Sequence, residues 1–313
     1  MLLARAGETQ AAREIYDSLI DELAKHPAPD LVYNEPYRRQ LAKLLGITQP
    51  PPYSLDGIVA EAAATTRVRP SRRAGGQVPD PDYEPAVAAP EFEPDKGPSV
   101  RIDQGHNNMH TVDGRYAGFA KLVRRDGYRV SALADSFSAE SLDETDILVI
   151  ANANFDPESD SDSVFQQEEI EVLFKWVSSG GSLLLIADHA PFGSAASDLA
   201  RRFGFEMTNS FAAERGKRPP MIFVRGQGLP AHPITDGRDQ AERVDRVTTF
   251  TGQGFKAPDD AEPLLAFSDE TEMITMKPGT RNQIVNRQDA KGYLQGAVLQ
   301  VGQGRIAVFG EAS

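Results

Sequence analysis

The sequence predicts a doubly wound α/β domain with a mainly parallel sheet, which begins at about Ser99 and follows a small helical N-terminal part. From Ser99 onward, apolar runs of strand length alternate with segments in which apolar residues recur at helical spacing. Two of these runs, at 146–151 and 182–187, are almost entirely apolar, which is typical of strands buried on both faces of a parallel sheet. Polar residues follow three of the predicted strands, where open parallel sheets bind ligands.

The elements of this domain are expected in the order strand, helix, strand, short helix, strand, helix, strand and helix, which favours right-handed crossovers. The strands are predicted at 100–102, 129–133, 146–151 and 182–187. Three of the helices are predicted from apolar stripes, which consist of Tyr116, Phe119, Ala120 and Val123, of Ile170, Leu173, Phe174 and Val177, and of Ala196, Leu199, Ala200 and Phe203.

The last third of the chain predicts shorter strands. They are expected at 221–225, 246–251 and 264–267, some extending the sheet and others forming an irregular antiparallel flap. A hairpin is predicted where the runs 296–301 and 305–309 flank a Gly-Gln-Gly turn.

Composition divides the chain into three parts. Residues 1–65 are predicted to form a small helical segment, residues 66–98 a Pro-rich linker with little fixed structure, and residues 99–313 the α/β domain.

A helix is expected at 11–23, where Gly7, Ala12 and Tyr16 stand at the spacing of the second helix of a tetratricopeptide repeat. The resemblance covers half of one repeat, and a single repeat cannot bury its own apolar face. The alternative is an ordinary amphipathic helix that packs on another element. In either case the N-terminal helices are candidates for binding a protein partner.

Charge and composition exclude several classes of protein. A net charge of -13 disfavours nucleic acid and anionic membranes as partners, because both are bound through clustered Lys and Arg. No apolar run approaches the ~20 residues of a membrane-spanning helix. The N-terminus lacks the apolar core of a secretory signal, so the chain as given is expected in the cytoplasm, or outside it if the N-terminus is incomplete. The chain has no Cys, which excludes disulfides, thiolate metal ligands and a cysteine nucleophile.

Three of the five histidines lie in loops that follow predicted strands. If the first four strands are ordered 2-1-3-4, these loops share one edge of the sheet, and their polar side chains converge. The expected catalytic residues are Asp103, His106, Asp188 and His189, and the expected ligand-binding residues are Asn107, His110, Asn152 and Asn154.

The sequence leaves open what such a cluster does. One interpretation is a divalent metal site, such as zinc, held by His106, His110, His189 and Asp188 or Asp103. A second interpretation is acid–base catalysis without a metal, in which an Asp orients a His.

The same loops also allow other interpretations. Ser194 next to His189 is a candidate nucleophile, although the Gly-x-Ser-x-Gly motif is absent and Ser is a common helix N-cap. The aspartates and asparagines could also be ordinary turn formers.

Four motifs resemble a largely bacterial family of uncharacterised domains within the class I glutamine amidotransferase-like superfamily. They run from Ile102 to Tyr116, from Gly180 to Phe192, from Thr249 to Gln253 and from Gly304 to Glu311. The chain is also distantly similar to gliding-motility and intraflagellar-transport type domains. The resemblance implies a flavodoxin-like α/β fold and adds Glu311 as a candidate ligand-binding residue.

True amidotransferases carry a nucleophilic Cys in the turn after the strand that corresponds to 182–187, where this chain has Asp188-His189. Formation of a thioester from glutamine requires a thiolate, so glutaminase activity is not expected. The leading hypothesis is a hydrolase-type or small-molecule-binding site at the carboxyl ends of the strands. The alternative is a non-catalytic protein-interaction module.

Overall fold

The computed structural model describes residues 80, 82–155, 164–217, 220–250, 252–276 and 284–312. These residues belong to a single compact unit. The predicted N-terminal helices, the tetratricopeptide-like helix and the first part of the Pro-rich segment lie outside the described residues.

Four parallel strands form one side of the main sheet, in the order β2-β1-β3-β4 on which the predicted convergence of loops depended. They are β1 (Ser99–Asp103), β2 (Arg129–Leu133), β3 (Ile147–Ala151) and β4 (Ser182–Ile186). The C-terminal strand β15 (Gly304–Phe309) adds in parallel to β4, and β14 (Leu294–Val301) pairs antiparallel with β15. The predicted hairpin and the α/β class are both confirmed.

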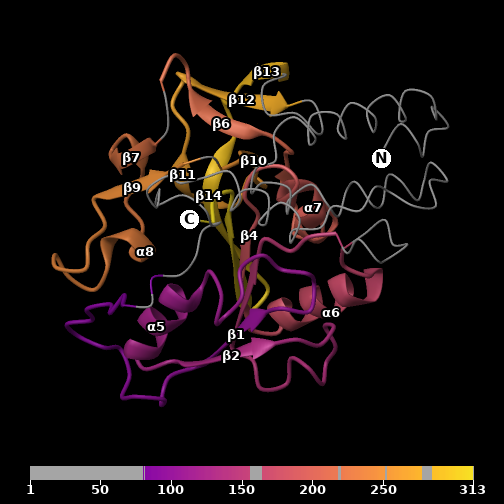
Figure 1. Ribbon diagram of the computed structural model, residues 1–313, viewed down its shortest axis with the longest axis vertical. Coiled ribbons are helices and arrows are strands. Elements are labelled where there is room, and N and C mark those ends of the chain that lie inside the picture. Colours follow the sequence, from indigo (N-terminus) through magenta and orange to yellow (C-terminus); the bar gives the residue numbers. More distant parts are fainter. Residues whose placement is uncertain are drawn as a thin grey trace, which may run out of the picture. The chain divides into compact units, whose positions relative to one another are not determined.

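Helices cover both faces of this sheet (Figure 1). They are α5 (Ala117–Arg125), α6 (Gln167–Ser178) and α7 (Phe192–Arg202). The chain moves one way across the sheet from β1 to β2 and the opposite way from β3 to β4. Right-handed crossovers therefore place α5 on one face and α6 on the other. None of the helices in the described ranges has the length and apolar character required to cross a membrane.

The short helix expected between β2 and β3 is absent from the described structure, in which residues 134–146 form turns. Two serine side chains explain the difference. The hydroxyl of Ser141 accepts a hydrogen bond from the backbone of Ser138, and the hydroxyl of Ser138 accepts one from the backbone of Ser141. Such bonds compete with helical hydrogen bonding.

The last third of the domain is mainly antiparallel. The expected strands correspond to β7 (Met221–Arg225), β9 (Arg246–Thr249) and β11 (Glu262–Ala266); β7 and β9 pair with each other, and β11 pairs with β14. A further sheet of β6 (Phe211–Glu214), β12 (Thr271–Met276) and β13 (Ile284–Asp289) was not expected. The short strands β5 (Glu206–Met207), β8 (Gly228–Leu229), β10 (Phe255–Lys256) and the four-residue helix α8 (Pro233–Asp236) complete the described elements.

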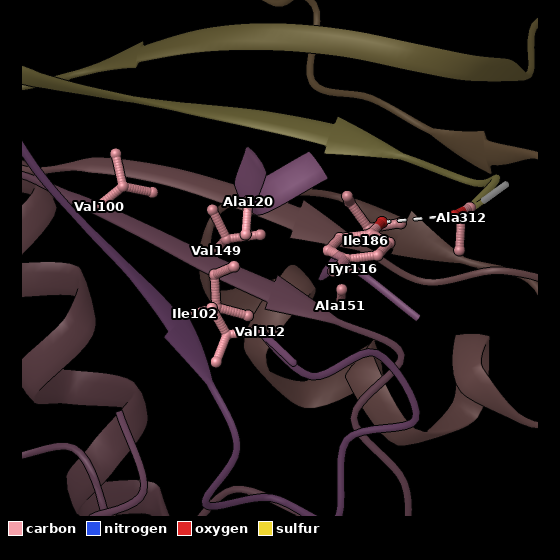
Figure 2. Packing of buried hydrophobic residues seen from close by; sticks show 9 residues of the cluster. All are labelled: Val100, Ile102, Val112, Tyr116, Ala120, Val149, Ala151, Ile186 and Ala312. Carbon is pink, nitrogen blue, oxygen red and sulfur yellow. Dashed lines mark hydrogen bonds between the residues drawn. The ribbon is translucent and has the colours of Figure 1, made fainter. Parts of the chain in front are cut away.

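A buried apolar cluster fills the space between the sheet and α5 (Figure 2). It contains Val100, Ile102, Val112, Tyr116, Ala120, Val149, Ala151, Ile186 and Ala312. Tyr116 lies at the N-cap of α5, and its hydroxyl donates to the backbone oxygen of Ala312 at 3.4 Å. The cluster therefore brings the start of α5 next to the end of the chain segment that follows β15.

The described part of the Pro-rich segment, 82–98, packs on the α/β domain. The ring of Phe92 meets the ring of Tyr128 edge-on at 5.1 Å, and its backbone N–H donates to Asp126 O at 3.2 Å. Glu84 forms ion pairs with Lys121 and Arg125 on α5. The compact unit accordingly begins at Pro79, ahead of β1.

Candidate active site

Two carboxylates follow neighbouring parallel strands at the same level. Ile186 of β4 is paired in register with Phe309 of β15, and Asp188 and Glu311 each stand two residues further along. Side chains two residues apart in an extended chain point to the same face of a sheet. Ile186 belongs to the cluster on the α5 face, and the two carboxylates lie at the edge of that face.

Asp188 and Glu311 are both buried, with 8% and 9% of their surface exposed. Burial raises the pKa of Asp188 to about 6, because a charged carboxylate is poorly solvated there. The negative charge of Glu311 also raises this pKa, whereas the charge and backbone N–H of His189 oppose the rise. Asp188 is therefore a carboxyl group that changes its protonation state close to neutral pH.

Phe250, Gly252 and Gln253 bond to the two residues that carry the carboxylates. Glu311 Oε2 accepts hydrogen bonds from the backbone N–H groups of Phe250 and Gly252, at 2.8 and 3.1 Å. The fully buried Gln253 donates from Nε2 to the backbone oxygen of Asp188 at 2.9 Å. A Cβ atom on Gly252 would lie 2.2 Å from Gly310 O, so only glycine lets the loop approach this closely. The Thr249–Gln253 motif thus has a structural role in building the site.

Asn152 joins the end of β3 to the end of β4. Its side-chain Oδ1 accepts from Asp188 N at 2.9 Å, and its backbone N–H donates to Ile186 O at 2.9 Å. Its φ of +50° lies in the left-handed region, which Asn tolerates better than most residues. Asn152 is therefore a residue that shapes the turn holding Asp188.

His110 and Tyr116 lie on the same side of the sheet as the two carboxylates. Burial and the charge of Arg115 lower the pKa of His110 to about 4, although Glu311 opposes this effect. The ring of His110 is therefore neutral at neutral pH, and it meets Tyr116 at 4.7 Å. Burial and the charges of Asp188 and Glu311 raise the pKa of Tyr116 above its ordinary value. Within the described residues, His110 Nδ1 is buried without a hydrogen-bond partner.

His189 is the half-buried member of the group. Its Nδ1 lies 2.8 Å from Ala190 O, so Nδ1 carries a proton and donates to this carbonyl. Its ring stacks on Phe211 at 4.6 Å. A carbonyl that fixes the tautomer and a ring that fixes the orientation are what a general base requires.

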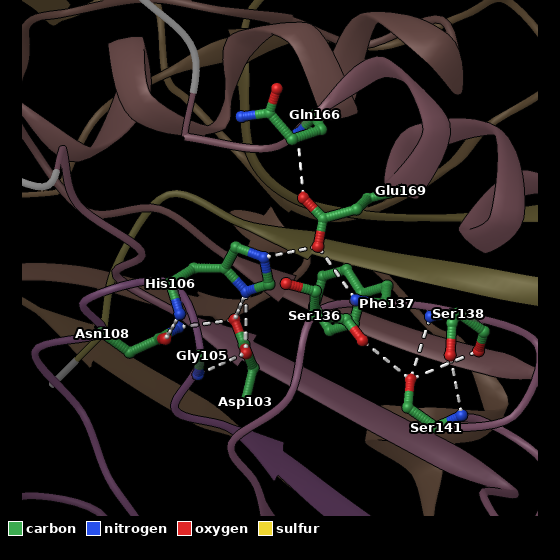
Figure 3. Close-up of polar contacts among 10 residues, drawn as sticks. All are labelled: Asp103, Gly105, His106, Asn108, Ser136, Phe137, Ser138, Ser141, Gln166 and Glu169. Atoms are coloured by element: carbon green, nitrogen blue, oxygen red, sulfur yellow. Dashed lines mark hydrogen bonds and ion pairs between the residues drawn. The ribbon is translucent and has the colours of Figure 1, made fainter. Parts of the chain in front are cut away.

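A second polar group lies on the α6 face of the sheet (Figure 3). His106, which is 7% exposed, donates from Nδ1 to Asp103 Oδ1 at 2.9 Å, and its Nε2 lies 3.0 Å from Glu169 Oε1. The imidazole also packs against the rings of Phe137 and Phe165, at 4.4 and 4.7 Å. We call Asp103, His106 and Glu169 the buried triad.

The buried triad contains a positively charged imidazole. Burial alone would lower the pKa of His106, but its hydrogen bonds to Asp103 and Glu169 and the charges of both carboxylates raise it to about 9. Although burial raises the pKa of Glu169, the bond to His106 and backbone bonds from Gln166 and Phe137 lower it overall. Both ring nitrogens of His106 are occupied, so neither is left to hold a metal or a substrate.

The cluster predicted from the sequence is thus divided between two faces of the sheet. Asn107 is exposed and donates to Phe155 O, whereas the backbone N–H of Asn154 donates to His106 O. Ser194 is exposed within α7, which begins at Phe192, so Ser194 is not its N-cap. In the described ranges no three His, Asp or Glu side chains are placed to hold a metal ion.

Sequence reasoning missed Glu169, Gln253 and Tyr116 as members of these groups. Glu169 could have been found, because it is the N3 residue of α6 and its Oε2 accepts from the N-cap backbone of Gln166. This leaves its Oε1 free to bond His106. Nothing local in the sequence marks Gln253 as a partner of β4.

Among known proteins, this chain is similar only to solved structures. No protein-family model matches the chain, and no curated protein matches it. The mmIFT52 N-terminal domain is similar, with 15% identity, a TM-score of 0.49 and coverage of 68% of this chain and 86% of that one. A ThuA-like protein from Bacteroides uniformis has 14% identity, a TM-score of 0.41 and coverage of 72% and 86%. A glutamine amidotransferase from Thermotoga maritima has 11% identity, a TM-score of 0.38 and coverage of 68% and 75%.

Proposed function

We propose that this protein is a hydrolase of small molecules, built on an amidotransferase-like domain that lacks the cysteine nucleophile. The observation that carries the proposal is the pair of buried carboxylates, Asp188 and Glu311, at the ends of adjacent parallel strands with the half-buried His189 next to them. Two titratable groups with different environments are the usual basis for dividing the roles of acid and base.

In the proposed reaction His189 is the general base and Asp188 the general acid. His189 Nε2 takes a proton from water as the water oxygen attacks an acyl carbon, and protonated Asp188 gives its proton to the leaving group. The proton on His189 then returns to Asp188, which restores both residues. Burial, together with the charge of Glu311, keeps Asp188 protonated at a higher pH than an exposed carboxyl group would allow.

The unpartnered Nδ1 of His110 supports a ligand at this edge. A buried polar atom without a hydrogen bond destabilises the fold by about 1–3 kcal/mol, so such atoms usually face a ligand or an ordered water. We assign His110 Nδ1 the role of accepting a hydrogen bond from the bound small molecule.

The test is hydrolysis of a panel of p-nitrophenyl esters, anilides and phosphate esters by the full chain. At least one compound is expected to be turned over, with about a hundredfold loss of kcat in Asp188→Asn and in His189→Ala. His232→Ala is the control, because His232 caps α8 outside the site. Turnover that both site variants retain would contradict the proposal. Absence of turnover in every chemical class would favour the non-catalytic interaction module instead.

A further inference from the structure

The loop between β1 and α5 carries His110 and is anchored by the buried triad. Asp103, the last residue of β1, accepts hydrogen bonds from Gly105 N at 3.1 Å and Asn108 Nδ2 at 2.9 Å, in addition to its bond with His106. The backbone N–H of His106 donates to Asn108 Oδ1 at 3.1 Å. The loop is therefore folded around the Asp103 carboxylate, as Figure 3 shows.

Glu169 fixes this loop to two other elements. Its Oε1 contacts His106 Nε2 and also accepts from Phe137 N at 2.9 Å, while its Oε2 accepts from Gln166 N at 2.9 Å. One carboxylate thus connects the β1 loop, the segment after β2 and the first turn of α6. These three parts of the chain carry none of the residues proposed to perform acid–base chemistry.

A short chain of hydrogen bonds leads from the triad to the proposed site. Asn154 N donates to His106 O at 3.0 Å, and Met109 N donates to Asn152 O at 3.0 Å. Asn152 in turn accepts from Asp188 N. A shift of the β1 loop would therefore move both His110, next in sequence to Met109, and the turn that holds Asp188.

We propose that Glu169 and His106 are positioning residues, which fix the β1 loop so that His110 and Asn152 stand correctly around Asp188. This inference rests on the proposed acid–base site and adds its supporting residues. Stability alone is a poor explanation for such a triad, because apolar side chains of similar volume often stabilise a fold as well as buried ions do. A fixed loop geometry is what the bonds at both ring nitrogens supply.

The experiment uses Glu169→Gln in the full chain, with Glu171→Gln as the matched control. Glu171 lies on the same helix and forms a partly exposed ion pair with Arg202. The readout is the titration midpoint of Asp188, followed by carboxyl carbon NMR, together with the ring nitrogen signals of His110. Burial, His189, Glu311 and a backbone bond set the pKa of Asp188, whereas Glu169 and His106 are not among its causes. Glu171→Gln removes a charge from the same helix, so a change seen only in Glu169→Gln is attributed to the loop.

Glu169→Gln is expected to move the Asp188 midpoint by at least about half a pH unit and to shift the His110 signals, while Glu171→Gln leaves both unchanged. If the Asp188 midpoint is raised in the wild type and Glu169→Gln leaves it unchanged, the inference is overturned and the proposed function stands. An ordinary midpoint in the wild type would instead remove the proposed acid–base site.

A double variant covers the case in which Glu169→Gln does not fold. Asp103→Asn with Glu169→Gln removes both negative charges, and a neutral His106 can still donate from Nδ1 to the amide oxygen at position 103. The amide at position 169 cannot both donate to His106 Nε2 and accept from Phe137 N, because Glu169 makes both bonds through Oε1. Because no unpaired charge is buried, this variant is expected to fold. Its Asp188 midpoint is expected to move by at least about half a pH unit, as in Glu169→Gln, because the two amide groups cannot reproduce the bonds from Asn108 Nδ2 and Phe137 N together with those to His106. An unmoved midpoint in the folded double variant would overturn the inference.

Discussion

Replacement of His106 by Ala is expected to lower the free energy of unfolding by about 3–5 kcal/mol at pH 7. The substitution leaves the carboxylates of Asp103 and Glu169 buried without their common partner, and removing one member of a buried ion pair typically has this effect. It also removes the contacts of the imidazole with the rings of Phe137 and Phe165. Urea unfolding of the two proteins measures the difference.

The effect of this substitution should depend on pH in a defined direction. The pKa of His106 is raised from 6.5 to about 9, so its contribution to stability is complete below about pH 6.5 and is lost as the pH rises through 9. A pKa difference of this size corresponds to about 3 kcal/mol. The gap between wild type and His106→Ala should therefore narrow between about pH 6.5 and pH 9.

His232→Ala provides the comparison for His106→Ala. His232 caps α8 and lies 3.6 Å from the exposed carboxylate of Glu262, so its removal should lower stability by only about 1 kcal/mol. A charged imidazole in the triad would be contradicted if both variants lost the same free energy of unfolding. It would also be contradicted if the difference in stability between wild type and His106→Ala stayed constant from pH 6 to pH 10.

Replacement of Asp188 by Asn is expected to stabilise the protein at pH 8, by up to about 3 kcal/mol. The pKa of Asp188 is raised from 3.8 to about 6, so its favourable contribution is complete below about pH 3.8 and is lost as the pH rises through 6. At pH 8 the wild type therefore buries an unfavourable charge, which Asn does not carry. The Asn side chain can still accept from His189 N.

Thermal and urea unfolding at pH 8 and pH 4 measure this gain, which should shrink toward zero at pH 4. Asp198→Asn is the control, because Asp198 is exposed on α7 and pairs with Arg201, and its effect should stay within about 0.5 kcal/mol. A loss of stability in Asp188→Asn at pH 8 would show that the fold favours the charged form. Stabilisation combined with loss of turnover is the behaviour expected of a residue retained for function.

Much of the parallel half of the fold could be predicted from the sequence, because its strands are local apolar runs and its helices local apolar stripes. The apolar runs became β3 and β4, and the stripes became α5, α6 and α7. Asp188 and Asn152 could be placed at one edge because each directly follows a predicted strand, whereas Glu311 was a candidate only through the family resemblance.

The division of the predicted cluster between two faces could not be seen from loop positions alone. Successive side chains along β1 point to opposite faces of the sheet. Because Ile102 faces α5, Asp103 faces α6, and this alternation could have revealed the division. The partner on that face, Glu169, is 63 residues away from His106, and no local pattern links them. The same is true of Gln253 and Asp188, which lie 65 residues apart.

The antiparallel sheets were less predictable for a related reason. The strand β13 is exposed along its whole length and carries Asn, Arg, Gln and Asp in its sequence, so no apolar alternation identifies it. Its pairing with β12 comes from backbone hydrogen bonds and from cross-strand ion pairs such as that of Arg287 with Glu272. Such pairs are recognisable only once the two strands are adjacent.

The titration of Asp188 in wild type and in Glu311→Gln tests the carboxylate pair most directly. Carboxyl carbon NMR is expected to give a midpoint near pH 6 in the wild type, because burial and the charge of Glu311 both disfavour ionisation. Glu311→Gln should lower this midpoint, since Gln can still accept from Phe250 N and Gly252 N but carries no charge. A midpoint near 4 in both proteins would contradict the carboxylate pair, and with it the acid–base site.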